Sequence, residues 1–388
     1  MKDYQMLQQQ YIVNTYVNRQ LTLVKGEGVF LLNEQGEKYL DLMTNYGVNI
    51  LGYHHPVITK KLVHQLNSLT TLHGSFANDV RSNASEALIK RCGESYTQVY
   101  WSNSGAEAIE AALKFAVLAT KKKKFIVCDH GYHGKTLGAL SATAGVKYKQ
   151  PFEPLLWDFV SIPFNDAEAL EQAIDVDTAG FIVEPIQGEG GIFVPEKNYL
   201  YTINEICHKK GILLIIDEIQ TGCGRTGTFL ASQKGNMAGD VLCLGKGLAG
   251  GIPVGVTLVN QVVAAAIPKH IHTSTLGGNP LASAGVVAIL DVVSTDLLKH
   301  VVNIGQYFLE QLAVLKSPYI GEVRGQGLMI GLVVHDKRNQ IMKQLQDKKI
   351  LVIPAGEDVI RFLPPFIIEK EQVDMTMSVL SNIFKQLP

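Results

Sequence analysis

The hydrophobic pattern of the chain centres on two short apolar runs that each end in a chemically reactive residue. Residues 212–216 are all Ile or Leu and are followed directly by Asp217. Such a run is typical of a strand buried on both faces inside a parallel sheet. The second run, Val241–Leu244, is followed by Gly245-Lys246-Gly247. Ligands of open α/β sheets bind beyond the carboxyl ends of the strands, so the pattern predicts a site with a carboxylate and an amine.

Apolar spacing elsewhere predicts strands that alternate with helices over about residues 98–260. The expected strands in this part are 98–101, 125–128, 180–184, 212–216 and 241–244, with a helix from the loop at 102–104 to about 120. Alternation of this kind predicts a parallel, doubly wound sheet with right-handed crossovers. Two helices, 57–69 and 82–93, are expected before it.

The two ends of the chain follow a different pattern. A hairpin over residues 25–42 with its turn at 33–36 is expected near the start. Long helical patterns at 281–315, a strand-like stretch at 323–334, a helix to about 348, the segment 350–366 and a helix from 369 are expected near the end. We therefore predict an α/β protein with a large domain over residues 51–290 and a smaller α+β domain over 291–388, to which residues 1–50 contribute.

Composition and charge narrow the range of partners. The 388 residues are 46% hydrophobic and 18% charged, which fits two unequal globular domains with well-buried cores. A net charge of −1 provides no basic face, so nucleic-acid binding is not expected. The uncharged stretch 247–268 contains Gly250-Gly251 and Pro253, which favour a turn and a buried strand over a membrane span.

The cysteines and the start of the chain indicate the compartment. Five cysteines without a C-x-x-C spacing predict neither a disulfide framework nor a zinc ribbon. The first ten residues lack an apolar core of the kind found in signal peptides, so a cytoplasmic location is expected.

A candidate phosphate site follows the strand expected at 98–101. The loop 102–104 is small and polar, and a helix starts at Gly105-Ala106. Free backbone amides and the helix dipole at such a start favour an anion. Ser104 with Glu107 three residues later is equally compatible with simple helix capping, and the sequence alone leaves the two interpretations open.

Two further motifs could indicate other ligands, a metal ion and a dinucleotide. His130 and His133 are spaced like metal ligands, but no third ligand stands at a recognisable spacing, so no metal is expected. Residues 222–227 match G-x-G-x-x-G, but they lie too far beyond the preceding strand, and no long helix follows them. The dinucleotide fingerprint requires a tight turn directly after the strand and a long helix after the glycines. A nicotinamide-dependent oxidoreductase is therefore disfavoured.

An acid and an amine at neighbouring strand ends suit a cofactor with a basic ring nitrogen and an aldehyde. The chain resembles the class III, ornithine-type aminotransferases, which are pyridoxal-phosphate enzymes of fold type I. The resemblance covers nearly the whole chain and rests on six motifs in order: Asn103-Ser-Gly-Ala-Glu107, Tyr132-His-Gly134, Glu184-Pro-Ile-Gln-Gly-Glu189, Asp217 to Gly227, Gly245-Lys246-Gly247 and Thr275-x-Gly-Gly-Asn-Pro280.

The resemblance implies roles for the residues around the cofactor. Lys246 would be the Schiff-base lysine and proton-transfer base, and Asp217 would keep the pyridine nitrogen protonated. The other expected cofactor contacts are Gln220 on the ring hydroxyl, Tyr132 on the ring face, and Ser104, Gly105 and Ala106 on the phosphate. Thr275 is expected to reach the phosphate bound by a second subunit, which implies a homodimer with shared sites.

Substrate contacts follow from the same resemblance. Arg361 matches a carboxylate-binding arginine, and Glu189 matches the glutamate that pairs with it when a diamine substrate is present. A purely structural Arg361–Glu189 salt bridge is the alternative. Ser274 and Lys135 are the other expected substrate contacts. Lys135 departs from the family, because ornithine and acetylornithine enzymes usually have arginine after His-Gly, and lysine keeps the charge but loses the planar fork.

The predicted reaction is a ping-pong transamination. The terminal amino group of an ornithine-like substrate, with N-acetylornithine as the leading candidate, passes to the cofactor and then to 2-oxoglutarate, giving a semialdehyde and glutamate. A diamine, 4-aminobutyrate or other ω-amino-acid transaminase is the alternative within the family. A pyridoxal-phosphate-dependent aminomutase or racemase, which needs no oxo-acid acceptor, is the alternative from another class.

Overall fold

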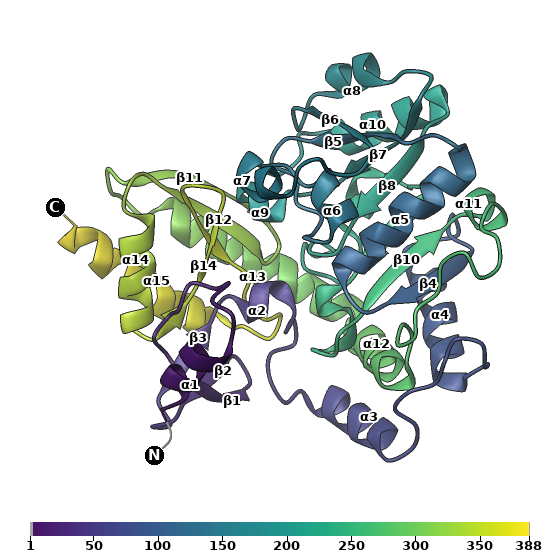
Figure 1. Cartoon of the computed structure of the whole chain (residues 1–388). Coiled ribbons are helices and arrows are strands. Elements are labelled where there is room, and N and C mark those ends of the chain that lie inside the picture. Colours follow the sequence, from purple (N-terminus) through teal and green to yellow (C-terminus); the bar gives the residue numbers. More distant parts are fainter. Residues whose placement is uncertain (1–2, 388) are drawn as a thin grey trace.

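The computed structural model describes residues 3–387, and its larger lobe is built on a seven-stranded sheet (Figure 1). The strand order is β4-β10-β9-β8-β7-β5-β6. The strands are β4 (Gln98–Ser102), β5 (Lys124–Cys128), β6 (Asp158–Ile162), β7 (Thr178–Val183), β8 (Leu213–Asp217), β9 (Val241–Leu244) and β10 (Gly255–Val259). Only β10 runs antiparallel to its neighbours, β4 and β9. The expected parallel sheet is therefore confirmed except at this strand.

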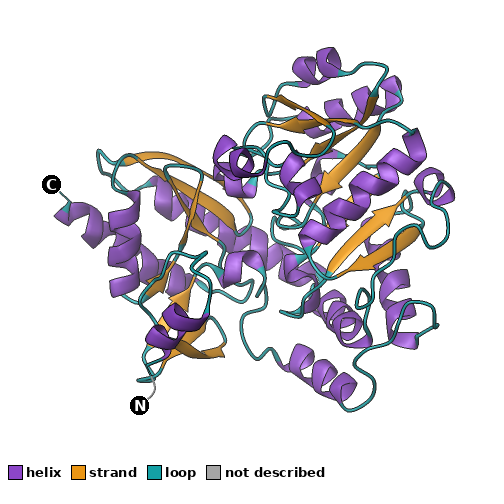
Figure 2. Cartoon of the chain, viewed as in Figure 1, coloured by secondary structure: helices purple, strands orange, loops and turns teal. Residues whose placement is uncertain are grey.

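The central apolar run lies where the pattern placed it. Strand β8 pairs in parallel with β7 on one side and β9 on the other. Successive residues of β8 point to opposite faces: Leu214 and Ile216 belong to one hydrophobic cluster, and Ile215 belongs to another that includes α5. Because helices cover both faces of the sheet (Figure 2), the strand is buried on both sides, and Asp217 emerges at its carboxyl end.

The helices flank this sheet or belong to the smaller lobe. Those that precede residue 280 are α1 (Tyr4–Tyr11), α2 (Thr44–Gly47), α3 (Pro56–Leu66), α4 (Asp79–Cys92), α5 (Gly105–Thr120), α6 (Leu137–Ala142), α7 (Val146–Lys149), α8 (Ala167–Ala173), α9 (Gly188–Gly191), α10 (Tyr199–Lys210), α11 (Gln261–Ala265) and the 3-10 helices η1 (Gln150–Phe152), η2 (Ala231–Gly235) and η3 (Lys246–Ala249). Those that follow are α12 (Pro280–Val292), α13 (Thr295–Ala313), α14 (Arg338–Asp347) and α15 (Lys370–Gln386).

The smaller lobe contains two four-stranded sheets and both ends of the described chain (Figure 1). One sheet has the order β1 (Leu23–Glu27), β2 (Phe30–Asn33), β3 (Lys38–Asp41) and β13 (Ile350–Leu351). The other has the order β11 (Ile320–Gln326), β12 (Met329–Val334), β15 (Val359–Phe362) and β14 (Ile353–Ala355). The parallel pairing of β13 with β3 joins the N-terminal hairpin to the C-terminal segment. The division of the chain into domains at residues 50 and 290 stays a prediction.

Two stretches near the C-terminus differ from the simple pattern. The helical stretch 281–315 is divided between α12 and α13, because the Ser294 side chain accepts a hydrogen bond from the Leu297 amide and starts a second helix. The strand-like stretch 323–334 is a hairpin that turns at Gly327, where φ is 57°. Within residues 3–387 no single helix is long and apolar enough to cross a membrane. Taken together, α12 and α13 have the length and composition of a membrane span, but the chain bends by 73° between them.

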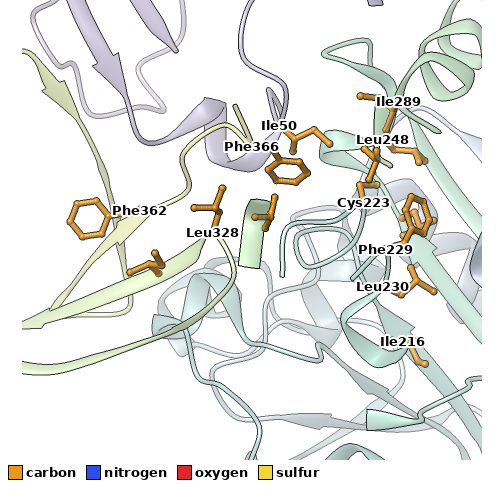
Figure 3. Close-up of a cluster of buried hydrophobic side chains, with 14 of the residues drawn as sticks. Ile50, Ile216, Cys223, Phe229, Leu230, Leu248, Ile289, Leu328, Phe362 and Phe366 are labelled. Atoms are coloured by element: carbon orange, nitrogen blue, oxygen red, sulfur yellow. The ribbon is translucent and has the colours of Figure 1, made fainter. Parts of the chain in front are cut away.

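The glycine-rich stretch 222–227 packs between the two lobes. A Cβ on Gly224 would lie 2.8 Å from the Leu298 side chain, and one on Gly227 would lie 2.3 Å from Val302. Both glycines therefore allow close contact with α13. Figure 3 shows Cys223 of this stretch, Leu328 and Phe366 among the buried side chains of the same region. The motif serves packing between the lobes.

Arg225 of the same stretch is a buried cation that contacts three distant segments. Its Nη1 donates to the carbonyls of Leu328 at 3.1 Å and Pro364 at 2.5 Å, and its Nη2 donates to Thr44 Oγ1 at 3.5 Å. The guanidinium also lies 4.9 Å from the Phe366 ring. Burial lowers the pKa of Arg225 to about 9, although the charge of Asp41 opposes this shift. Arg225 therefore connects the large-domain loop to the smaller lobe.

We expect Arg225→Met to lower the free energy of unfolding by about 2–4 kcal/mol, because it leaves buried carbonyl acceptors without a donor. Urea unfolding of the purified protein measures the change. Lys209→Met removes a cation from an exposed position and provides the control, which should unfold like the wild type. Equal stability of Arg225→Met and the control would contradict a connecting role for this guanidinium.

Candidate active site

Asp217 is a buried carboxylate with two defined partners. Its Oδ1 accepts a hydrogen bond from the Ile219 amide at 3.0 Å, and its Oδ2 lies 2.7 Å from His133 Nδ1. A carboxylate only accepts hydrogen bonds, so His133 carries a proton on Nδ1. Burial lowers the pKa of His133, but the hydrogen bond and charge of Asp217, together with the charge of Glu184, outweigh this effect and raise it. The imidazole thereby fixes the orientation of the acid.

Glu184 connects the loops on either side of this pair. Its Oε1 accepts from the Tyr132 amide at 2.8 Å, and its Oε2 accepts from the Gly188 amide at 3.2 Å. Burial raises the pKa of Glu184 to about 7, against the opposing charge of His133, and the charge of Asp217 raises it further. A single buried carboxyl therefore holds the loop after β5 against the loop after β7.

Lys246 follows β9 in a left-handed backbone conformation with φ of 45°. Burial lowers the pKa of its ammonium, the Glu189 carboxylate opposes this shift, and the nearby Arg361 charge lowers the pKa further. A lowered pKa favours the neutral, nucleophilic amine. Within the described part of the chain, Lys246 Nζ has no hydrogen bond or salt bridge, so the amine is available for a ligand.

The glycines beside Lys246 allow close packing around it. A Cβ on Gly245 would lie 3.4 Å from Gly105 Cα, so the lysine loop lies against the start of α5. A Cβ on Gly247 would lie 2.6 Å from the Ile50 side chain. The lysine loop therefore lies against the start of α5 and against Ile219, two residues after Asp217.

The start of α5 has both a helix cap and free backbone amides, the two interpretations that the sequence left open. The Ser104 side chain caps the helix by accepting from the Glu107 amide at 3.2 Å. The amides of Gly105 and Ala106 donate to no acceptor among residues 3–387, so two donors at the positive end of a 16-residue helix remain for an anion. Capping and phosphate binding are therefore compatible here.

Arg361 is hydrogen-bonded to two other expected site residues, Gln220 and Glu189. Its Nη1 donates to Gln220 Oε1 at 3.0 Å, and its Nη2 forms a 2.8 Å salt bridge with Glu189 Oε1. The Arg361 side chain is fully buried, and its Nε lacks a partner among the described residues. Burial raises the pKa of Glu189, but the charges of Arg361 and Lys246 outweigh this effect and lower it. The salt bridge is thus formed in this structure.

The residues expected around the ring and at the partner subunit lie in separate loops. Tyr132 is partly buried, and burial raises the pKa of its hydroxyl to about 12. Ser274 Oγ accepts from Asn103 Nδ2 at 3.3 Å and from the Gly277 amide at 2.9 Å, so its loop lies beside the start of α5. Thr275 and Lys135 are exposed. The role of Thr275 in a second subunit stays a prediction.

The sequence interpretation missed three members of this site. His133 was considered only as a metal ligand, and Glu184 was quoted in a motif without a role. The third, Tyr46, lies on α2, where four successive residues have φ between 43° and 89°. The Arg361 guanidinium lies 5.6 Å from the centre of the Tyr46 ring. Nothing in the local sequence indicates this left-handed turn, because it depends on the distant contacts of Thr44 with Arg225 and Leu363.

Comparisons with known proteins agree with this geometry. Residues 11–384 match the family model of class III aminotransferases. The chain is 40% identical over 379 residues to the acetylornithine aminotransferase of Aquifex aeolicus, covering 96% of this chain and 99% of that protein. It is also 40% identical to a candidate LysW-aminoadipate semialdehyde/glutamate semialdehyde transaminase of Pyrococcus furiosus, covering 95% and 97% of the two chains.

Solved structures give the same result. An ornithine aminotransferase from Toxoplasma gondii, with partial occupancy of pyridoxal phosphate at its active site, superposes with a TM-score of 0.93 at 33% identity and covers 98% of this chain and 94% of that one. An acetylornithine aminotransferase from Elizabethkingia anophelis gives 0.87 at 31% identity, with 99% and 98% covered. The chain therefore belongs to the class III aminotransferases, with the fold of this family, and its cofactor is pyridoxal phosphate.

Proposed function

We propose that this enzyme transfers the terminal amino group of an ornithine-like donor, with N-acetylornithine as the leading candidate, to 2-oxoglutarate. The observation that carries the proposal is the buried Arg361–Glu189 salt bridge beside Lys246. A transaminase of this kind must accept a donor that reacts through a terminal amine and then an acceptor with a carboxylate next to its reacting carbon. Glu189 neutralises Arg361 for the first substrate, and release of this salt bridge would free the planar guanidinium to bind a carboxylate of the second.

The residues of the site fit the cofactor. Bound pyridoxal phosphate supplies an electrophilic carbonyl carbon and an electron-withdrawing ring. The Gly105 and Ala106 amides would bind its phosphate, and Tyr132 would cover one face of the ring. Asp217, oriented by His133, would hold a proton on the ring nitrogen, and Lys246 Nζ would form the covalent link and move the proton at the reacting carbon.

The assembly and the location belong to the same proposal. The exposed Thr275, expected at the phosphate of a neighbouring site, favours a homodimer with shared active sites. A cytoplasmic location is compatible with the five cysteines, which are all buried and free.

Lys135 supports a second candidate within the family. A lysine at this position binds a carboxylate less specifically than an arginine, which favours diamines, 4-aminobutyrate or other ω-amino acids as donors. An aminomutase or racemase differs from both candidates because it turns over an amino acid without an oxo acid.

An amine screen with 2-oxoglutarate tests the proposal. We expect glutamate to form with N-acetylornithine at a higher kcat/KM than with putrescine or 4-aminobutyrate. The reverse order would select the second candidate. Conversion of an amino acid without any oxo-acid acceptor, combined with no turnover of any ω-amine, would contradict transamination.

A further inference from the structure

The loop that carries His133 is held in place by buried side chains of other segments. The Tyr132 amide donates to Glu184, and the next two amides share a single acceptor. Thr143 Oγ1 accepts from the His133 amide at 2.9 Å and from the Gly134 amide at 3.2 Å. Because these two amides lie on either side of the His133 Cα atom, the threonine hydroxyl fixes the point from which the imidazole side chain extends.

The Thr143 hydroxyl uses its full hydrogen-bonding capacity. A hydroxyl has one proton to donate and two lone pairs with which to accept. The two amides occupy both lone pairs, and the proton is shared between the Gly134 carbonyl at 3.1 Å and the Ala139 carbonyl at 3.0 Å. Thr143 is buried, so loss of its hydroxyl would leave two buried amides without an acceptor.

Thr143 is itself tied to α5, the helix whose first amides are expected to bind the phosphate. Glu110 of α5 accepts from the Gly138 amide at 2.8 Å and thereby holds α6, the helix that ends directly before Thr143. The loop also packs on α5, because a Cβ on Gly134 would lie 2.8 Å from the Ala106 side chain. Thr143 therefore fixes the His133 loop relative to the start of α5.

The His133 imidazole connects this loop to the acid of the site. Its Nδ1 lies 2.7 Å from Asp217 Oδ2, and both side chains are buried. A hydrogen bond of this kind depends strongly on distance and direction, so a shift of the His133 backbone would weaken it. We propose that Thr143 is a positioning residue, whose hydroxyl places His133 so that the imidazole orients Asp217 toward the ring nitrogen of the cofactor. This inference rests on the role proposed above for Asp217.

Two substitutions of Thr143 separate the hydroxyl from the shape of the side chain. Thr143→Val keeps the shape and removes the hydroxyl, whereas Thr143→Ser keeps the hydroxyl. In the holoenzyme, Thr143→Val should lower kcat about tenfold, as expected for a lost buried hydrogen bond, and should leave KM nearly unchanged. Thr143→Ser should recover most of kcat. The control Thr202→Val removes a hydroxyl that donates to the Asn198 carbonyl on α10 and should behave as the wild type.

The titration of His133 provides a readout that a loss of packing alone would not change. In Thr143→Val the weakened bond to Asp217 should lower the pKa of His133, because burial then favours the neutral imidazole. Thr143→Ser should keep the pKa raised. Histidine signals in NMR titrations measure both values. An unchanged His133 pKa in Thr143→Val, or equal impairment of the serine and valine variants, would overturn the positioning role.

A second background tests whether Thr143 acts through the acid. In Asp217→Asn the carboxylate is already absent, so adding Thr143→Val should lower kcat less than about twofold. A further tenfold loss in the double variant would overturn the inference. Full activity of Asp217→Asn alone would contradict the role proposed for the acid, and the His133 titration would still decide whether Thr143 positions the imidazole.

Hydrogen exchange of the wild-type holoenzyme tests the hydrogen bonds without any substitution, which keeps the inference testable if Thr143→Val does not fold. The amides of His133 and Gly134 should exchange as slowly as those of the buried strand β8, although they lie in a loop. Exchange at the rate of an exposed loop would overturn the proposed role of Thr143.

Discussion

Purified Lys246→Ala is expected to lack the visible absorption band of the wild-type holoenzyme and to lose more than about a thousandfold in transaminase turnover. The reason is that Lys246 Nζ is the amine at the strand end that has a lowered pKa and no protein partner among residues 3–387. Alanine keeps the backbone but removes both the covalent link and the proton-transfer base. Absorption spectra before and after borohydride treatment, with steady-state rates, measure both effects.

Lys234→Ala provides the matched control for this substitution. Lys234 is another lysine of the larger lobe whose pKa is lowered by desolvation, and its Nζ donates to the Thr226 carbonyl. The control should keep the absorption band, its reduction by borohydride and nearly all of the activity. A Lys246→Ala protein that retains a reducible band would show that another amine holds the cofactor.

The parts of the molecule set by local pattern were predictable. A run of five Ile and Leu residues predicts a strand that is buried on both faces, as in the interior of a sheet covered by helices on each side. Since carboxyl ends of parallel strands lie at one edge, the meeting of Asp217 and Lys246 follows from the order of the strands. The turn after β2 was predictable for a similar reason, since Asn33 Oδ1 accepts from the amides of Gln35 and Glu37.

Features that depend on contacts between distant segments were not predictable. The antiparallel direction of β10 is not encoded in its composition, because a buried strand is apolar in either direction. The left-handed turn that presents Tyr46 to Arg361 requires Thr44 to bind Leu363 and Arg225. The buried pair of His133 and Asp217 joins residues 84 positions apart, and a single sequence gives no measure of such proximity.

Asp217→Asn is expected to retain the visible band, because Lys246 remains, but to lower kcat by about a hundred- to a thousandfold. The substitution keeps the size of the side chain and removes the charge that would hold a proton on the cofactor ring. It also removes the anion that raises the pKa of His133. Rates, absorption spectra and the histidine signals in NMR titrations of both proteins measure these three consequences.

The His133 titration gives this prediction a second, independent outcome. In the wild type the raised pKa of His133 means that its charged pair with Asp217 stabilises the fold below the ordinary histidine pKa of about 6.5, and this stabilisation is lost as the pH rises through the raised value. In Asp217→Asn, burial favours the neutral imidazole, so the pKa of His133 should fall and its contribution should disappear. Asp217→Glu keeps the charge on a longer side chain and should therefore lose less activity than Asp217→Asn while keeping the pKa of His133 higher. Equal losses in both variants would show that the position of the carboxyl, and not its charge, limits the reaction.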